Sequence, residues 1–333
     1  MKSTRRLLII VALSGMMILN CRGPLRSSQN LPLFRLGVVS WIGYGPAYVG
    51  VEQKLFEQEG VRVEIKRIED TGQLRTALVS KEVDAIIGTA DSIASGAAAG
   101  LPAKVVLEVD ESFGADALVV SSAIKSLRDL RGKQVAFAQG LPSHFFLLTL
   151  LQEEGLSSSD IKPVYMEAPE AGAAFVAERV DAAVTWEPWV TQALKRNGAR
   201  TLFTSRTHPS IIVDLIAVHS EVARTRATDV RAFLRGWFRS VNQIQMDPPG
   251  THTILARAFG VPQTDIASML NGLRFASLQD NRHFFGLDGG NAVPFVVLFD
   301  RAGVAWEHEH LIDRAADGKM FFDPAPIGAL RQQ

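Results

Sequence analysis

The segment Trp186-Glu187-Pro188-Trp189 has the residue types that point most directly to chemistry. It follows the apolar run 182–184, so it lies at the end of an expected strand. A carboxylate flanked by two indole rings suits a cationic or amine-bearing ligand group, through charge pairing and cation–π contact. Asp214 offers a second carboxylate. Glu187 has an alternative interpretation as an acidic residue at a helix start, since Pro188 fits a first helical turn.

A helix N-terminus is predicted after Pro142, with Ser143 as its cap, and Gln139 opens the loop before it. Unpaired N–H groups and a partial positive charge allow such a terminus to hold an anion. Ser143 is therefore expected at an anionic ligand group, or else serves only as a cap. His144 is a weaker candidate, because a lone histidine is often a packed or surface residue. Two carboxylates and one helix N-terminus favour a zwitterion, such as an amino-sulfonate, over nitrate.

The loop Trp41-Ile42-Gly43-Tyr44-Gly45 is a third candidate binding element. Its glycines, Gly43 included, permit close backbone approach, and Trp41 and Tyr44 offer aromatic walls. The alternative is that both rings pack within the protein surface. A fourth loop follows the expected strand near residue 87 and contributes the polar candidates Thr89, Asp91 and Ser92, although Asp91 or Ser92 can equally be a plain helix cap.

Two copies of one α/β plan position these four loops. Residues 77–85 match residues 174–182 at an offset of 97, and the first strands, near Arg35 and Lys133, are offset by 98. Chance similarity between ordinary α/β units is the alternative to a true repeat. The repeat predicts two lobes, each a small open sheet with flanking helices. Because open α/β sheets bind ligands beyond the carboxyl ends of their strands, the loops define a cleft between the lobes.

Composition narrows the function classes. The 333 residues are enough for about two domains, and 35 Lys+Arg balance 35 Asp+Glu with no basic stripe, so nucleic-acid binding is not expected. Neither H-E-x-x-H, G-x-S-x-G nor a P-loop is present, so no catalytic residue, metal or cofactor is predicted. His308-Glu309-His310 is interpreted as an exposed polar stretch, since it lacks partners at metal-ligand spacing.

The N-terminus indicates export. Basic residues in the first six positions precede an uncharged apolar run over 7–19, which is too short for a spanning helix but suits a signal peptide. Cys21, the single cysteine, follows at once, which resembles the lipobox of bacterial lipoproteins. Asn20 departs from the small residue usual there, and the alternative is a secretory signal with an incidental cysteine. We expect a signal peptide over 1–20, acylation of Cys21 and a tether over 21–32.

The chain resembles the nitrate/sulfonate/taurine-type (NMT1/THI5-like) solute-binding proteins of ABC importers, in lipoprotein form. The resemblance covers 34–286 and rests on Gly43-Tyr44-Gly45-Pro46-Ala47-Tyr48 and on 56–61, 140, 143–148, 180–189, 212–214, 275–276, 281–282 and 284–286. It implies a type II periplasmic-binding-protein fold, two α/β lobes joined by two crossovers. Placing the crossovers at Leu118-Val119-Val120 and Leu215-Ile216-Ala217-Val218 assigns 33–118 and 218–333 to lobe 1, and 119–217 to lobe 2.

The resemblance implies a monomeric, extracytoplasmic receptor that closes its lobes on a small anionic or zwitterionic solute, sulfonate- or taurine-like. Its partners would be an ABC permease with its ATPase, and the membrane through the lipid anchor. Two alternatives remain open. One is an enzyme on the same fold, of the pyrimidine or menaquinone biosynthesis type, although such enzymes work inside the cell. The other is a chemosensory receptor that binds the solute without transporting it.

Overall fold

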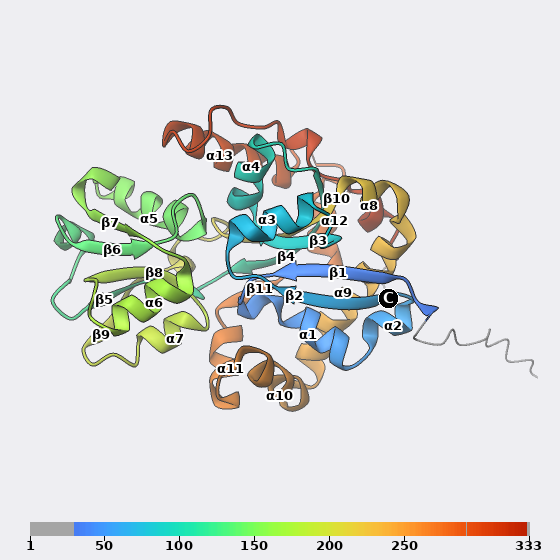
Figure 1. The fold of residues 1–333 in the computed structure, drawn as a ribbon, viewed down its shortest axis with the longest axis horizontal. Coiled ribbons are helices and arrows are strands. Elements are labelled where there is room, and N and C mark those ends of the chain that lie inside the picture. The colour runs from blue at the N-terminus through green and yellow to red at the C-terminus, as the bar shows by residue number, and fades with distance from the viewer. Residues whose placement is uncertain (1–29, 291, 332–333) are drawn as a thin grey trace, which may run out of the picture.

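The computed structural model describes residues 30–290 and 292–331, which form two α/β lobes side by side (Figure 1). The signal peptide, Cys21 and nearly all of the tether lie outside the described residues. No helix in the described part of the chain combines the length and apolar character that crossing a membrane requires. The predicted two-lobe α/β architecture is confirmed by this arrangement of two separate sheets.

The first lobe contains a six-stranded sheet in the order β11-β4-β10-β3-β1-β2. Its strands are β1 (Leu33–Val38), β2 (Arg62–Arg67), β3 (Ala85–Thr89), β4 (Ala103–Ser112), β10 (Val213–His219) and β11 (Leu273–Phe275). Strand β1 pairs parallel to β2 and β3, whereas β10 runs antiparallel to β3 and β4. The ends of β1 and β3 therefore point the same way, toward the second lobe (Figure 1).

The second lobe repeats this order with five strands, β7-β6-β8-β5-β9. They are β5 (Asp116–Ser121), β6 (Gln134–Phe137), β7 (Lys162–Tyr165), β8 (Ala182–Trp186) and β9 (Ala199–Thr204). Along β5, Leu118 and Val120 face one hydrophobic cluster, while Ala117 and Val119 face another. A strand buried on both faces reads as a continuous apolar run, which is why 117–120 shows no polar alternation.

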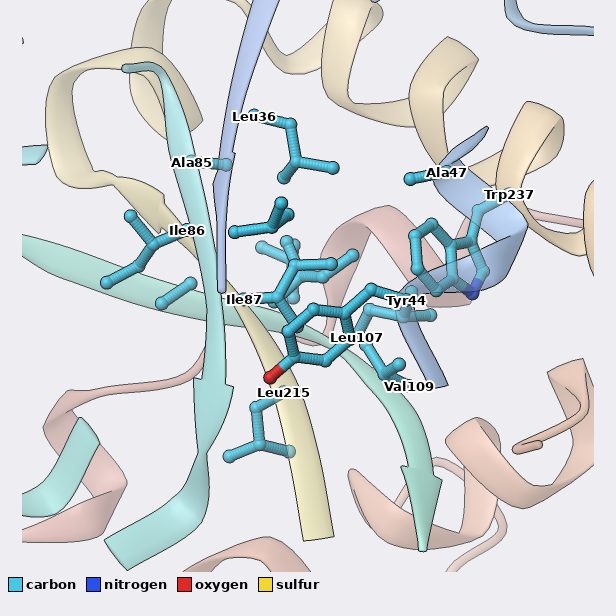
Figure 2. Close-up of a cluster of buried hydrophobic side chains, with 14 of the residues drawn as sticks. Leu36, Tyr44, Ala47, Ala85, Ile86, Ile87, Leu107, Val109, Leu215 and Trp237 are labelled. Atoms are coloured by element: carbon cyan, nitrogen blue, oxygen red, sulfur yellow. The ribbon is translucent and has the colours of Figure 1, made fainter. Parts of the chain in front are cut away.

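Helices cover both faces of each sheet. In the first lobe, α1 (Gly45–Glu52), α2 (Leu55–Glu59) and α9 (Ala227–Met246) pack together on one side, and α3 (Thr71–Val79) and α4 (Ala90–Ala98) cover the other (Figure 1). In the second lobe, α5 (Pro142–Glu153) lies opposite α6 (Ala168–Val176) and α7 (Trp189–Ala193). Figure 2 shows the first core, where Trp237 of α9 lies near Ala47 and Leu107. The chain after β10 adds α8 (Ser220–Thr225), α10 (Pro248–Phe259), α11 (Gln263–Leu270), α12 (Leu278–Phe284), α13 (Pro294–His308) and α14 (Ala325–Gly328).

The internal repeat extends to backbone detail. Helices α3 and α6, and strands β3 and β8, begin and end 97 residues apart. The acidic turns between them place Lys81 and Glu178, again 97 apart, in the left-handed conformation at φ 60° and 59°. In both lobes an aspartate then accepts the backbone N–H of the first strand, Asp84 from Arg35 at 2.7 Å and Asp181 from Gln134 at 2.9 Å.

The expected crossover positions were wrong. Leu118-Val119-Val120 lies inside β5 of the second sheet, and 215–218 lies inside β10 of the first sheet. The chain instead passes between the sheets at 113–115 and 205–212. The physical reason is that each extended apolar segment pairs inside the sheet of the lobe that the chain has just entered. Strand β5 becomes a buried interior strand of the second sheet, and β10 becomes one of the first sheet. The lobe boundaries therefore fall at these two connections.

Candidate functional site

A cavity of about 50 Å³ lies between the lobes, where the carboxyl ends of β1 and β3 face the second lobe. Two indole N–H groups bridge the lobes beside it: Trp186 Nε1 donates to Ser40 O, and Trp306 Nε1 donates to Asp91 O, both at 3.0 Å. The lobes are thus in contact around the cavity. Six of the predicted binding residues line it: Trp41, Tyr44, Thr89, Ser92, Trp186 and Asp214.

The three aromatic residues present ring surface to the cavity because their polar atoms are engaged elsewhere. Tyr44 Oη donates to Asp214 Oδ1 at 2.5 Å, and Trp41 Nε1 lies 3.3 Å from Asp110 Oδ1. Trp186 Nε1 bonds Ser40 as described. An aromatic wall beside carboxylates is a favourable surround for a cationic group.

Carboxylates are concentrated at this site. Asp116 lines the cavity and is 2% exposed, and its Oδ2 has no hydrogen-bond partner among the described residues. Burial raises the pKa of Asp116 to about 8; the Ser112 hydroxyl opposes this shift, and the charges of Asp214 and Asp91 contribute to it. Burial likewise raises the pKa of Asp214 to about 7, although the Tyr44 hydroxyl opposes that shift. Burial, with Asp214 second, also raises the pKa of Asp110. A bound cation would relieve the cost of ionising these groups.

The start of α4 carries a second set of polar atoms without partners. The Thr89 Oγ1 and both Asp91 carboxylate oxygens are buried and make no hydrogen bond within the described residues. Thr89 and Ser92 line the cavity, whereas Asp91 does not, and burial raises the pKa of Asp91 to about 7. A buried polar group without a partner is costly, so a ligand or water that paired with these atoms would be stabilised here.

Arg75 supplies a positive charge to the cavity. It lies on α3, is half-buried, and donates from Nη1 to Ser92 O at 3.3 Å. No ion pair of its guanidinium is found within the described part of the chain. Burial lowers the pKa of Arg75, an effect that the more distant Glu167, Asp70 and Asp91 oppose. A guanidinium with free N–H groups at a cavity wall is suited to an oxyanion.

Three predicted residues are buried beside the cavity without lining it. A Cβ on Gly43 would collide with Asp110 and Trp41, so this glycine lets those two side chains meet. Ser143 does not cap α5, which begins at Pro142; its Oγ accepts the Ala138 N–H at 3.0 Å. His144 stacks on Phe137 at 5.0 Å between ring centroids and accepts the Gly140 N–H at Nδ1.

Two more predicted residues point elsewhere. Gln139 is exposed and is not part of the cavity lining. Glu187 accepts the Thr191 N–H at 3.0 Å and the Thr191 hydroxyl at 2.9 Å, so its carboxylate serves the start of α7. This is the helix-start alternative that the sequence left open. The carboxylate that accompanies Asp214 in the cavity lining is therefore Asp116, not Glu187.

Sequence reasoning missed Arg75, Asp110 and Asp116. A signal for the aspartates exists, since Asp110 lies near the end of the apolar strand β4 and Asp116 begins the next apolar strand, β5. In the sequence, Arg75 looks like the other charged residues on surface helices. The lobe repeat alone sets it apart, because the matching position in the second lobe, residue 172, is glycine.

No group of three His, Cys, Asp or Glu residues able to hold a metal occurs in 30–290 or 292–331.

Known proteins share this chain's sequence pattern. The family model described as "NMT1/THI5 like" matches residues 41–270. A protein of Escherichia coli (strain K12), named for binding aliphatic sulfonates, is 33% identical over 157 residues, covering 45% of this chain and 47% of that protein. A protein of Brachyspira hyodysenteriae, named as an ABC transporter periplasmic binding protein, is 22% identical over 238 residues, covering 67% and 68%. The chain thus spans about half the length of the E. coli relative.

Solved structures share the fold. The E. coli periplasmic aliphatic sulphonate binding protein SsuA superposes with a TM-score of 0.74 at 22% identity, covering 90% of this chain and 94% of that one. The desulfurization enzyme DSZB has the same architecture at a TM-score of 0.62, 14% identity and coverage of 89% and 98%. The family match spans more than two thirds of the sequence, and the two lobes with exchanged strands agree with it. The chain belongs to the NMT1/THI5-like family, whose periplasmic-binding-protein fold it adopts.

Proposed function

We propose that this chain is the extracytoplasmic solute-binding protein of an ABC importer, and that it captures a small amino-sulfonate or a closely similar zwitterion between its lobes. The single observation that carries the proposal is the interlobe cavity, whose lining combines one arginine with buried aspartates and aromatic rings. The similarity to proteins named for aliphatic sulfonate binding supports the sulfonate group.

The anionic end of the solute would lie against the first lobe. Arg75 offers N–H donors without a competing carboxylate, and Thr89 offers an unpartnered hydroxyl one residue before α4. The N-terminus of α4 adds a partial positive charge. A sulfonate has three acceptor oxygens, so it can use guanidinium, hydroxyl and backbone donors together.

The amine end would lie against Asp116 and Asp214, with Trp41, Tyr44 and Trp186 around it. An ammonium group bound there would satisfy the free Asp116 oxygen and gain cation–π contact. The cavity of about 50 Å³ is narrow, which favours a solute with few carbons over a long alkyl chain.

Closure about the two connections would then present one surface of the receptor to a membrane permease, whose ATPase lies in the cell. Acylation of Cys21 and the tether over 21–32 would keep the receptor at the membrane, as a monomer. The naming of relatives as periplasmic binding proteins supports this location. A permease and an ATPase encoded beside this gene would favour transport over a sensory role.

The test begins with mass spectrometry of solute released from freshly purified protein, followed by calorimetry. The panel contains taurine, ethanesulfonate as its desamino analogue, longer alkanesulfonates, nitrate and small amines. We expect taurine-sized amino-sulfonates to bind at least about tenfold more tightly than ethanesulfonate, equal to about 1.4 kcal/mol. Equal affinity for ethanesulfonate would mean that the site does not recognise the amine of the solute. Turnover of a sulfur compound, without stable binding, would favour an enzyme on this fold.

A further inference from the structure

The C-terminal helix α13 belongs to both lobes. Phe295, Phe299 and Ala302, from its first three turns, are buried in the core of the first lobe. Trp306, one turn later, is fully buried in the core cluster of the second lobe, and Leu311 packs against the same cluster. Figure 1 shows α13 lying beside α4 and extending toward α5. A single continuous helix therefore spans the two bodies that the crossovers at 113–115 and 205–212 connect.

Trp306 makes its contacts on both sides of the cleft. Its Nε1 donates to the carbonyl oxygen of Asp91, in the first turn of α4, at 3.0 Å. Its ring is stacked near His144 of α5, with 5.6 Å between centroids and 26° between planes. Phe145 meets the same indole edge-on at 5.6 Å. Burial lowers the pKa of His144 to about 4, so the imidazole is neutral at physiological pH and packs as an aromatic ring.

These contacts lie directly behind the candidate site. Thr89 and Ser92, on either side of Asp91, line the cavity, and so do Leu141 and Pro142 at the start of α5. Trp306 thus holds the N-terminus of α4 against the N-terminus of α5, and residues at both termini line the cavity.

We propose that α13 is a third connection between the lobes, and that Trp306 is a positioning residue that latches them in the closed form. Separation of the lobes requires Trp306 to leave either Asp91 or the second core, because α13 is fixed in the first core by two phenylalanines. The latch stabilises the closed form without touching the solute. It consequently slows solute release and draws the unliganded receptor toward closure.

The test measures the distance between lobes without any solute. Spin labels on Arg62→Cys and Lys162→Cys report it, since both positions are exposed and each opens the outer parallel strand of its own sheet. Both changes are made in the full chain carrying Cys21→Ser. In this background Trp306→Ala is expected to shift the unliganded distance distribution to longer values, and Trp306→Phe to shift it part of the way, because phenylalanine keeps the ring but lacks the N–H.

Trp237→Phe is the matched control. Trp237 is equally buried, but it lies in the first core alone, and its Nε1 has no partner among the described residues. We expect this variant to leave the interlobe distance unchanged. With a solute identified by mass spectrometry, Trp306→Phe should dissociate about 3–10-fold faster, whereas Trp237→Phe should not.

Trp306→Phe keeps the inference testable if Trp306→Ala fails to fold. Unchanged distances in every folded Trp306 variant would overturn the latch, and so would a Trp237→Phe shift of equal size. Because the distance is measured without solute, this outcome is independent of whether the chain binds amino-sulfonates. Failure of the proposed function leaves the distance prediction in force.

Discussion

The two lobes are built on one plan but present different chemistry to the cleft. At matching positions 97 residues apart, the first lobe has Arg75 and Thr89, and the second has Gly172 and Trp186. The backbone elements that carry these pairs have identical lengths. The two lobes therefore share backbone geometry in these elements, while the side chains at their strand ends and helix faces differ.

The lobes present different chemistry because one residue differs three positions after the matched strands, Ser92 after β3 and Trp189 after β8. Ser92 is small and leaves Arg75 open to the cavity, where it donates to the Ser92 carbonyl. The matching residue in the second lobe is Trp189, whose Cβ lies 3.3 Å from where a Gly172 Cβ would be, so α6 faces an indole instead of a cavity. The first lobe supplies most of the charge together with Trp41 and Tyr44, and the second supplies Trp186 together with one acid, Asp116.

Removing the first lobe's cation should have the largest effect. Arg75→Ala is expected to weaken binding of the sulfonate-bearing solute about 100-fold, roughly 3 kcal/mol, because a charge-assisted contact with an oxyanion is lost. Calorimetry measures the change. Arg179→Ala removes an exposed arginine from the second lobe and is the matched control. A loss of affinity below about threefold for Arg75→Ala would mean that the anionic group of the solute binds at another place.

The second lobe's acid should control stability as pH changes. Asp116 has a folded-state pKa of about 8 against an ordinary 3.8, so the unliganded folded protein keeps a proton that the unfolded chain loses. The free energy of unfolding should therefore fall as pH rises from about 4 to about 8. Asp116→Asn cannot ionise, and it should be more stable than the parent at pH 8.5 by on the order of 2 kcal/mol.

Denaturant unfolding at pH 5 and pH 8.5 measures this difference. Asp214→Asn should gain less, because Tyr44 already donates to that carboxylate. An amine-bearing solute should show the opposite trend, with affinity rising over pH 6–8 as the aspartates ionise more readily beside it. Parallel pH profiles for the parent and Asp116→Asn would mean that Asp116 stays ionised in the folded protein.

The aromatic wall should contribute less than Arg75. Trp186→Phe keeps an aromatic surface but loses the hydrogen bond to Ser40 O, so we expect about a fivefold loss of affinity, near 1 kcal/mol. The effect should be mainly on the dissociation rate, since the bond joins closed lobes. Trp189→Phe, at the neighbouring indole whose Nε1 has no partner in the described chain, should change affinity by less than twofold.

The matched turns should show the smallest effect. Lys81 and Glu178 both adopt left-handed φ values, which cost a non-glycine residue roughly 1 kcal/mol. Glu178→Gly should raise the free energy of unfolding by about 0.5–1 kcal/mol. Lys81→Gly should gain less, because Lys81 pairs closely with Glu221, whereas the Glu178 carboxylate lies 3.9 Å from Arg196 Nε. Equal gains in denaturant unfolding would mean that the close Lys81–Glu221 pair stabilises the fold no more than the longer Glu178–Arg196 pair does.

Several features of the fold could be predicted because they depend on residues that are close together in the sequence. The strands near Arg35 and Lys133, and the helix–turn–strand repeat that ends at Ala85 and Ala182, follow from apolar periodicity. Six of the predicted residues line one cavity because each follows or begins a recognisable strand or loop, and their part in ligand binding stays a prediction: Trp41, Tyr44, Thr89, Ser92, Trp186 and Asp214. Glu187 and Ser143 do not line the cavity, because each side chain accepts a hydrogen bond from a nearby backbone N–H. The amino-acid composition of these segments does not reveal such local bonds.

The sequence by itself determined a two-lobed α/β chain with ligand loops at strand ends, since hydrophobic pattern and repeat depend only on near neighbours. Only the tertiary structure decided which lobe contains β5 and β10, and that Asp116, Asp214 and Arg75 line one cavity. It also placed one helix in both cores, with Trp306 between Asp91 and His144. Those outcomes depend on contacts between residues far apart in the chain, which packing selects and local pattern cannot specify.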